Sequence, residues 1–463
     1  RARAATALRE NDAAEVDLDV VEREAAAVGD DVAVARALVV RGDLLRNRGL
    51  LDESIAVLEQ AALRWRSIGD RRGEASALRR IGWSYVYAGD FERAEPPILE
   101  ALAAFREVRV ARGIAWALQN LALISFNRGQ TVLAEERLQD SRQLFIELGD
   151  RAGELWASST LAIVWQSQGN TDAAEELAER MLAEGPLEGD AVSTATIQLV
   201  LGMIRLRQGR VASAAEMLRK AHDAFWANAD WFRWARAVGP LVRALRRSGR
   251  VADADAVVVG STARVESLPA TSIDRMIPAL IAAEHRVELG DPVLPEVAPV
   301  AGRPVPTGYA RADEEVRALA LAQLGRAGEA DELVHAADVE RPEVLALASL
   351  VLAAAGRFDD ARATIDVLRG LGGSMYHDLV VGDLAEALAN AATGDREGVR
   401  SALRHAERLL EDTDDRLTVA IVGTARQTLL GDPAGSEGMN QLGLPAQGWR
   451  TLFASRVAAT PTS

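Results

Sequence analysis

The side chains that most often carry out catalysis are few in this sequence and lie far apart. No two histidines fall within one helical turn and no His-Glu-x-x-His pattern occurs, so their spacing predicts no zinc site. The single lysine, Lys220, stands between Arg219 and Ala221, which leaves no Gly-Lys-Ser/Thr phosphate loop and no supported Schiff-base lysine. Cysteine is absent, which excludes thiol catalysis and thiolate metal ligands. We therefore expect no enzyme, no metal and no cofactor. The histidines are His222, His285, His335, His377 and His405.

Aromatic side chains gather around a break at Ala229-Asp230, and an arginine-rich stretch follows them. Such a cluster either anchors another domain or subunit or holds two helices together, and we expect the second. The arginines either meet an acidic partner or a phosphate or form a solvated helix face, and we expect the solvated face. The aromatic residues are Phe225, Trp226, Trp231, Phe232 and Trp234, and the basic ones are Arg233, Arg236, Arg243, Arg246, Arg247 and Arg250. The candidates for a secondary interface are Trp226, Trp231, Trp234, Arg243 and Arg247.

A forty-residue period runs through the chain and shows which elements must position these side chains. Glycine recurs at Gly49, Gly89, Gly129, Gly169, Gly209 and Gly249, and a Gly-Asp pair recurs at Gly29, Gly69, Gly149 and Gly189. Between the breaks, apolar residues follow helical spacing. A glycine supplies the left-handed residue that ends a helix, and the following Asp can accept from the free N–H groups of the next helix. Each unit is therefore predicted to be two antiparallel helices of about four or five turns.

Small and aromatic residues within the unit from Leu78 to Leu102 resemble a tetratricopeptide repeat. Gly82 and Tyr85 stand at the small and aromatic positions of the first helix, and Ala94 and Ala101 at the small positions of the second. The forty-residue length is similar to the arrays of kinesin light chains and of actinobacterial signal-transducing ATPases and transcriptional regulators. The resemblance implies an all-α fold, a right-handed superhelix (α-solenoid) of antiparallel helix pairs.

The same resemblance implies that the first helices line a concave face that binds partners. Residues at the inward-facing positions combine aromatic rings, arginine and amides, which is the composition of binding hot spots. The residues expected there are Arg79, Arg80, Trp83, Tyr87, Trp116, Gln119, Asn120, Phe126 and Trp156. Asn120 falls where peptide-clamping members place an Asn against the ligand, whereas the basic partners of a carboxylate clamp are not clearly reproduced. Alternatively, Trp83 and Trp116 pack between adjacent first helices as core.

The period predicts four regions along the chain. They are a partial repeat (1–29), a regular array (30–250), degenerate helical repeats (251–430) and a C-terminal cap or tail (431–463). Further turns are expected at Gly290, Gly325, Gly356 and Gly394. Prolines between residues 291 and 308 forbid a second helix there and predict an ordered loop or hinge. A short amphipathic piece from Trp449 to Phe453 is expected to cover the last hydrophobic face. Because the chain starts inside a repeat, we expect it to be part of a larger protein.

Composition narrows the classes of partner. The formal net charge of −15 disfavours general nucleic-acid binding, which needs a basic surface. No apolar run reaches the roughly 18–20 residues that span a bilayer, so we expect a cytoplasmic protein. The leading hypothesis is a regulatory module of a bacterial signalling or transcriptional regulator that binds a protein or peptide, or the preceding domains of the same polypeptide. The alternatives are a self-assembling architectural solenoid and, less favoured, an enzyme within residues 251–430.

Overall fold

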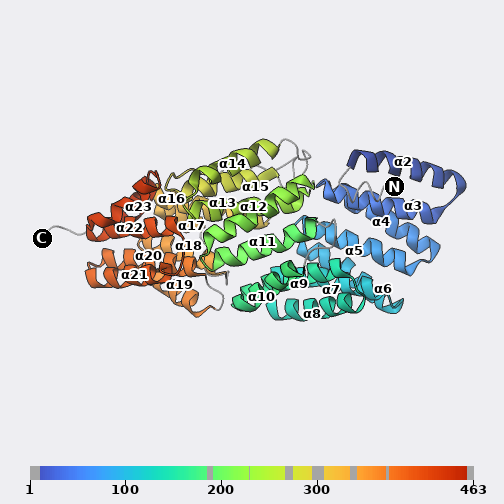
Figure 1. The fold of residues 1–463 in the computed structure, drawn as a ribbon, viewed down its shortest axis with the longest axis horizontal. Helices are drawn as coiled ribbons and strands as arrows, with labels where there is room; N and C mark the ends of the chain where they lie inside the picture. Colours follow the sequence, from blue (N-terminus) through green and yellow to red (C-terminus); the bar gives the residue numbers. More distant parts are fainter. Residues whose placement is uncertain are drawn as a thin grey trace.

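The structure, a computed structural model, describes residues 11–184, 191–228, 230–265, 275–294, 307–333, 341–371 and 375–455. Every regular element in these ranges is a helix, which confirms the expected all-α fold. The molecule is elongated, with the first helices at one end and the last helices at the other (Figure 1). None of the described helices is both long enough and apolar enough to cross a membrane.

The first part of the chain forms a regular array in which each helix packs against the next. The first helices of the pairs are α3 (Asp31–Asn47), α5 (Arg71–Tyr87), α7 (Ala111–Asn127), α9 (Arg151–Ser167), α11 (Ala191–Arg207) and α13 (Trp231–Arg247). The second helices are α4 (Leu51–Ile68), α6 (Phe91–Glu107), α8 (Thr131–Glu147), α10 (Thr171–Ala183), α12 (Val211–Ala227) and α14 (Val251–Arg264). They follow α2 (Asn11–Val28), a single helix that packs on α3.

The turns between these helices use the residues that the sequence pattern indicates. Gly89 has a φ of 74°, and its N–H donates to the carbonyl of Val86 while that of Asp90 donates to the carbonyl of Tyr85. The Asp90 carboxylate then accepts from the backbone N–H of Arg93 and so caps α6. The same cap is made by Asp30, Asp70, Asp150 and Asp230. These contacts confirm the predicted role of the Gly-Asp breaks.

Glycines also let consecutive helices approach closely. A Cβ built on Gly82 would lie 2.3 Å from the Ile98 side chain and 2.7 Å from the carbonyl oxygen of Ala94. A second forty-residue series, which the sequence pattern had not revealed, places an aromatic ring of each of the second helices α4, α6 and α8 on a glycine of the next helix. The pairs are Trp65 on Gly73, Phe105 on Gly113 and Phe145 on Gly153. Two series of small residues, rather than one, therefore allow consecutive helices to pack closely.

The remaining helices are less regular and pack into a second unit with its own hydrophobic core. They are α15 (Met276–Glu288), α16 (Thr307–Gln323), α17 (Ala327–Leu333), α18 (Pro342–Ala355), α19 (Phe358–Gly370), α20 (Tyr376–Ala392), α21 (Arg396–Leu410), α22 (Arg416–Leu430), the 3-10 helix η4 (Pro433–Ser436), α23 (Glu437–Gln441) and α24 (Gln447–Ala454). The expected turn glycines Gly290, Gly325, Gly356 and Gly394 all have positive φ, between 76° and 86°. Of the predicted loop, residues 291–294 lack regular structure, residues 295–306 lie outside the described residues, and α16 begins at Thr307.

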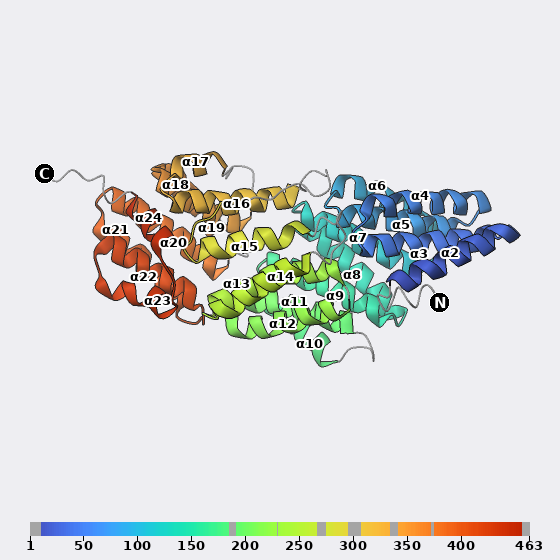
Figure 2. The same ribbon diagram turned by 90° about the horizontal axis from the view of Figure 1, so that it is seen from above.

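The C-terminal helix α24 packs against α22 and also against α16. Trp449, Leu452 and Phe453 are buried in the core of this second unit. The Trp449 indole donates to the backbone carbonyl of Glu288 at 3.0 Å, and the N–H of Gly448 donates to the carbonyl of Gly290 at 2.9 Å. The start of α24 is therefore hydrogen-bonded to the end of α15, and Figure 2 shows α24 at the same end of the molecule as α22.

Candidate functional site

One groove collects most of the side chains predicted to bind a partner. It has a volume of about 500 Å³ and lies across the first helices α3, α5, α7 and α9, with the start of α13 at its edge. Arg79, Arg80, Trp83, Tyr87, Trp116, Gln119, Asn120 and Trp156 line it together with Val40, Asp43, Arg46, Asn47 and Arg233. The predicted concave positions therefore do lie together, while their binding role stays a prediction.

The aromatic walls of the groove are fixed by packing behind them. The Trp83 ring meets the Tyr87 ring edge-on, with centroids 5.5 Å apart, and packs on the core of α5 to α7. Trp116 lies edge-on to the buried Phe145, with centroids 5.1 Å apart. Each tryptophan is half-buried, so one part of the ring belongs to the core and the other faces the groove. The two interpretations of these residues, core and groove wall, therefore both hold.

A single carboxylate serves two arginines on the floor of the groove. Asp43 accepts from Arg46 at 2.7 Å and from Arg80 at 2.9 Å. Burial opposes ionisation of this carboxyl, but Arg80 and Arg46 together hold the pKa of Asp43 below its ordinary value. Arg80 also donates to the Ser76 hydroxyl at 2.5 Å, and the Arg46 guanidinium lies 5.5 Å from the centre of the Tyr87 ring. Both cations are thus held in place before any ligand arrives.

Arg79 differs from its neighbours because it forms no ion pair with any described carboxylate. Its guanidinium lies 5.8 Å from the centre of the Trp116 ring. With the Asn120 amide oriented so that its nitrogen donates to the carbonyl of Trp116, its oxygen lies 3.3 Å from Arg79 Nη1. Burial, together with the charges of Arg80 and Arg46, lowers the pKa of Arg79 to about 9. The groove therefore contains a cation that forms no ion pair with the carboxylates of the described residues.

Phe126 is the one predicted concave residue that does not line the groove. It is half-buried and packs against the hydrophobic core that joins α7 to α11, so its place on the binding face stays a prediction that the groove does not support. Conversely, the α3 residues Val40, Asp43 and Asn47 were missed, although they lie forty residues before Arg80, Trp83 and Tyr87. Extending the period by one unit toward the N-terminus would have found them.

Two segments of the chain, residues 33–107 and 113–183, match the family model described as tetratricopeptide repeat. These two segments are therefore tetratricopeptide repeats. The matched segments contain every residue that lines the groove except Arg233. No curated protein sequence gives a match to this chain.

Among solved structures, the chain is similar to BtubC (BKLC) from P. vanneervenii, with 20% sequence identity over 49% of this chain and 91% of that chain, at a TM-score of 0.37. It is also similar to the apo form of the quorum sensor NprR from B. thuringiensis, with 13% identity over 79% of this chain and 98% of that chain, at a TM-score of 0.44.

The aromatic cluster beyond the matched repeats is largely interior. Trp234 is fully buried, and its indole donates to His222 Nε2 at 2.9 Å. Trp226 lies 5.2 Å from Trp234 between ring centres and is half-buried beneath the Arg264 guanidinium. The side chain of Trp231 lies outside the described part of the structure. Trp234 therefore cannot serve as an exposed anchor, because it fills the core between α12 and α13.

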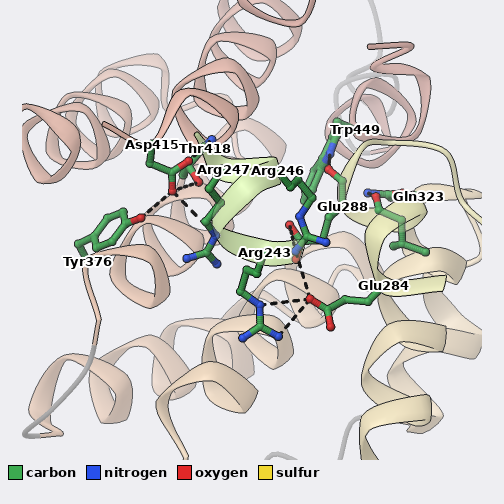
Figure 3. A network of polar contacts seen from close by, with 11 residues as sticks. Arg243, Arg246, Arg247, Glu284, Glu288, Gln323, Tyr376, Asp415, Thr418 and Trp449 are labelled. Carbon is green, nitrogen blue, oxygen red and sulfur yellow. Dashed lines mark hydrogen bonds and ion pairs between the residues drawn. The ribbon is translucent and has the colours of Figure 1, made fainter. Parts of the chain in front are cut away.

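The arginine-rich stretch of the regular array is likewise not a solvated face. Arg246 is 0% exposed and Arg247 is 3% exposed. Glu284 of α15 accepts from Arg243 and from Arg246, both at 3.1 Å (Figure 3). These contacts join the array to the second unit, so the expectation of a solvated helix was wrong. Helix α13 has neighbouring helices on both sides, so its arginines are removed from water. The acidic partners from α15 and from the start of α22 offset the free-energy cost of burying these charges.

Asp415 is the second acidic partner at this junction. It is buried and accepts from the Tyr376 hydroxyl at 2.7 Å and from the Thr418 hydroxyl at 2.7 Å, while Arg247 Nε lies 3.9 Å away (Figure 3). Burial and the adjacent Asp415 carboxylate raise the pKa of Tyr376, so the phenol stays protonated and keeps donating. Arg243 and Arg247 therefore have acidic partners within the chain, at the contact between its two units.

Proposed function

We propose that this chain is a protein-interaction module whose groove over α3, α5, α7 and α9 holds a segment of a partner protein. The observation that carries the proposal is the convergence of Trp83, Trp116, Trp156 and four arginines on one groove. Aromatic residues and arginine dominate binding hot spots because they combine large contact area with directional hydrogen bonds. The groove volume of about 500 Å³ also lies within the range of ligand sites.

Packing behind the groove supports binding with a low entropic cost. Phe145 supports Trp116, and Asp43 holds Arg46 and Arg80, so these side chains lose little freedom when a ligand binds. We further propose that the module acts in the cytoplasm as the sensor or scaffold arm of a bacterial signalling or transcriptional regulator. This finer role is supported by the forty-residue repeat length, which resembles the arrays of such regulators.

Photo-crosslinking in cells tests the groove directly. A photo-crosslinking amino acid in place of Asn47, on the groove, is compared with the same residue in place of Leu63, which is 63% exposed on α4. We expect a crosslinked partner from position 47 and none from position 63. Trp83→Ala combined with Trp116→Ala should abolish that crosslink while circular dichroism shows that the helices remain. Crosslinking that persists in a folded double variant overturns the proposal.

The identity of the crosslinked species tests the finer role. A nucleotide-binding or DNA-binding regulatory protein, or such a domain in the full-length gene product, supports the regulatory arm. A second copy of this chain as the sole product supports the architectural alternative instead.

A further inference from the structure

We infer that the contact between the regular array and the second unit binds a small oxyanion of the phosphate class, held by Arg243 and Arg247 of α13 and by His377 at the start of α20. Such a site lies on other helices than the groove over α3, α5, α7 and α9, so it does not depend on what that groove holds. The contact supports it through buried hydrogen-bond donors without an acceptor, through the exposure of Arg243, and through the cationic surroundings of His377.

Arg247 is buried with too few acceptors for its five N–H donors. Its side chain is 4% exposed, yet Nε and Nη1 form no hydrogen bond with any described residue. Asp415 offsets part of its charge, but Oδ2 of that carboxylate lies 3.9 Å from Arg247 Nε, which is too far for a hydrogen bond. The same oxygen already accepts from the hydroxyls of Tyr376 and Thr418, both at 2.7 Å. Because buried donors without an acceptor cost free energy, Arg247 favours a further acceptor at this position.

The other two arginines of the contact share a single carboxylate oxygen. Glu284 Oε1 accepts from Arg243 Nη2 and from Arg246 Nη2, both at 3.1 Å, and from Arg243 Nε at 3.2 Å. Arg246 keeps Nε and Nη1 without an acceptor among the described residues. The buried side of α13 therefore presents more donors than the described part of the chain satisfies, and an oxyanion supplies the acceptors that are lacking.

Arg243 gives a ligand access from solvent. Its side chain is 38% exposed, in contrast to that of Arg247, which stands four positions later on the same helix. Residues four apart share one face of a helix, and Figure 3 shows both guanidinium groups on the same side of α13. An anion that reaches Arg243 from solvent therefore meets the buried Arg247 next.

The start of α20 brings a third donor to this face. Burial and the charges of Arg247, Arg243 and Arg246 hold the pKa of His377 well below its ordinary value. No carboxylate of the described residues counteracts them, so the surroundings of His377 are cationic. Its neutral imidazole makes no hydrogen bond with a described residue and has one N–H that can donate to an anion.

The arrangement favours a phosphate-type ion over a carboxylate. A phosphate group presents at least three strong acceptor oxygens, which suits donors that converge from two helices. A carboxylate presents two oxygens in one plane and is matched by a single guanidinium fork. Since α13 belongs to the regular array and α20 to the second unit, the bound ion also strengthens the contact between the two units.

Titration of the full chain with inorganic phosphate tests the site. Isothermal titration calorimetry in chloride buffer of matched ionic strength should show saturable binding of one ion per chain. Arg243→Gln should weaken binding roughly tenfold to hundredfold, and His377→Phe, which removes a neutral donor, roughly threefold to tenfold. Arg250→Gln removes an exposed guanidinium from the same arginine-rich stretch and should leave binding unchanged. Thermal unfolding gives a second measure, because phosphate should raise the midpoint of wild type and of Arg250→Gln more than that of Arg243→Gln.

Several outcomes would contradict the phosphate site. Arg243→Gln and His377→Phe variants that keep their helices by circular dichroism and bind phosphate as tightly as wild type would overturn it, as would the absence of saturable binding up to roughly 10 mM phosphate. An equal loss in Arg250→Gln would indicate nonspecific attraction of ions, and acetate that binds as tightly as phosphate would indicate a carboxylate ligand instead. The Trp83→Ala, Trp116→Ala variant should bind phosphate like wild type, so this site and the groove are tested separately.

Discussion

The carboxylate of Asp414 accepts a hydrogen bond from the backbone N–H of Ala212 at 3.0 Å, although 202 positions separate the two residues. A second carboxylate oxygen accepts from Val211, and the N–H of Asp414 donates to the carbonyl of Gly209 at 3.1 Å. Arg210, the residue just before α12, makes no side-chain hydrogen bond that caps this helix. Asp414 therefore caps a helix of the regular array from the turn before α22, and this contact ties the two units together.

Removing this cap should weaken the whole chain. We expect Asp414→Ala to lower the free energy of unfolding by about 1 kcal/mol, because the first N–H groups of α12 lose their acceptor. Urea denaturation followed by circular dichroism measures the change. The neighbouring Asp412 is exposed, so Asp412→Ala serves as the control and should leave the midpoint unchanged. Equal effects of the two substitutions would show that the cap does not contribute.

The buried hydroxyl of Tyr376 provides a second test of how much the contacts between the two units stabilise the chain. Tyr376→Phe removes a donor to Asp415, whose carboxylate is buried, and we expect a loss of about 1–2 kcal/mol in stability. Tyr85→Phe is the matched control, because the Tyr85 ring meets Arg93 through its face and not through the hydroxyl. If both phenylalanine variants unfold at the wild-type urea concentration, the Tyr376 contact is energetically neutral.

Asp378 makes stability depend on pH. Burial raises its pKa to about 6, so the folded state holds a proton more tightly than the unfolded state does. Stability should therefore fall as the pH rises from about 4 to 6, and the cost of the charged carboxylate is fully present above pH 6. Asp378→Asn keeps an acceptor for the N–H of Met375 and removes the charge. It should be more stable than wild type at pH 7, by on the order of 2 kcal/mol, and similar at pH 4.

A matched cap provides the control for this pH dependence. Asp395 caps α21 through the N–H of Gly398 and is exposed, so Asp395→Asn should not change the slope of stability against pH between 4 and 6. An Asp378→Asn variant that keeps the wild-type slope would contradict the assignment to Asp378.

Two glycines in helices should respond oppositely to alanine. At Gly82, a Cβ would press against the Ile98 side chain and the Ala94 carbonyl, so Gly82→Ala should destabilise the array by about 1–3 kcal/mol. At Gly260, nothing lies within 4 Å of a Cβ, so Gly260→Ala should stabilise the chain by about 0.5–1 kcal/mol through higher helix propensity. Thermal unfolding measures both. Ile98→Val should partly restore the Gly82→Ala variant, and a failure of rescue would place the strain at the Ala94 carbonyl.

Arg79 should separate binding from stability. Arg79→Gln removes a cation that repels Arg80 and Arg46 and lacks an ion pair with the described carboxylates, so we expect an unfolding midpoint equal to or above that of wild type at pH 7.5. Arg80→Gln, by contrast, breaks the contact with Asp43 and should lower the midpoint. Differential scanning calorimetry of both variants makes the comparison. A clear loss of stability in Arg79→Gln would mean that Arg79 has a structural role.

The sequence by itself determined the helix pairs, their turns and most of the groove. Turn glycines such as Gly89 and caps such as Asp90 act within a few residues, so their signals are local and repeat with the period. The groove positions on α5, α7 and α9 were predictable for the same reason, because equivalent residues of stacked repeats share one face. Phe126, near the end of α7, departs from this rule because the core of the following repeats covers it.

Only the tertiary structure decided which charges are buried and where the chain returns on itself. Arg246 and Arg247 read as a solvated face in the sequence, yet Glu284 and Asp415 reach them from α15 and from the start of α22. No local sequence pattern predicts the contact of α24 with α15. The lack of an ion pair between Arg79 and the described carboxylates is likewise not visible in any local pattern. A repeat period specifies contacts between neighbouring helices, whereas contacts between distant helices depend on rotations that accumulate along the superhelix, and no single stretch of sequence contains that sum.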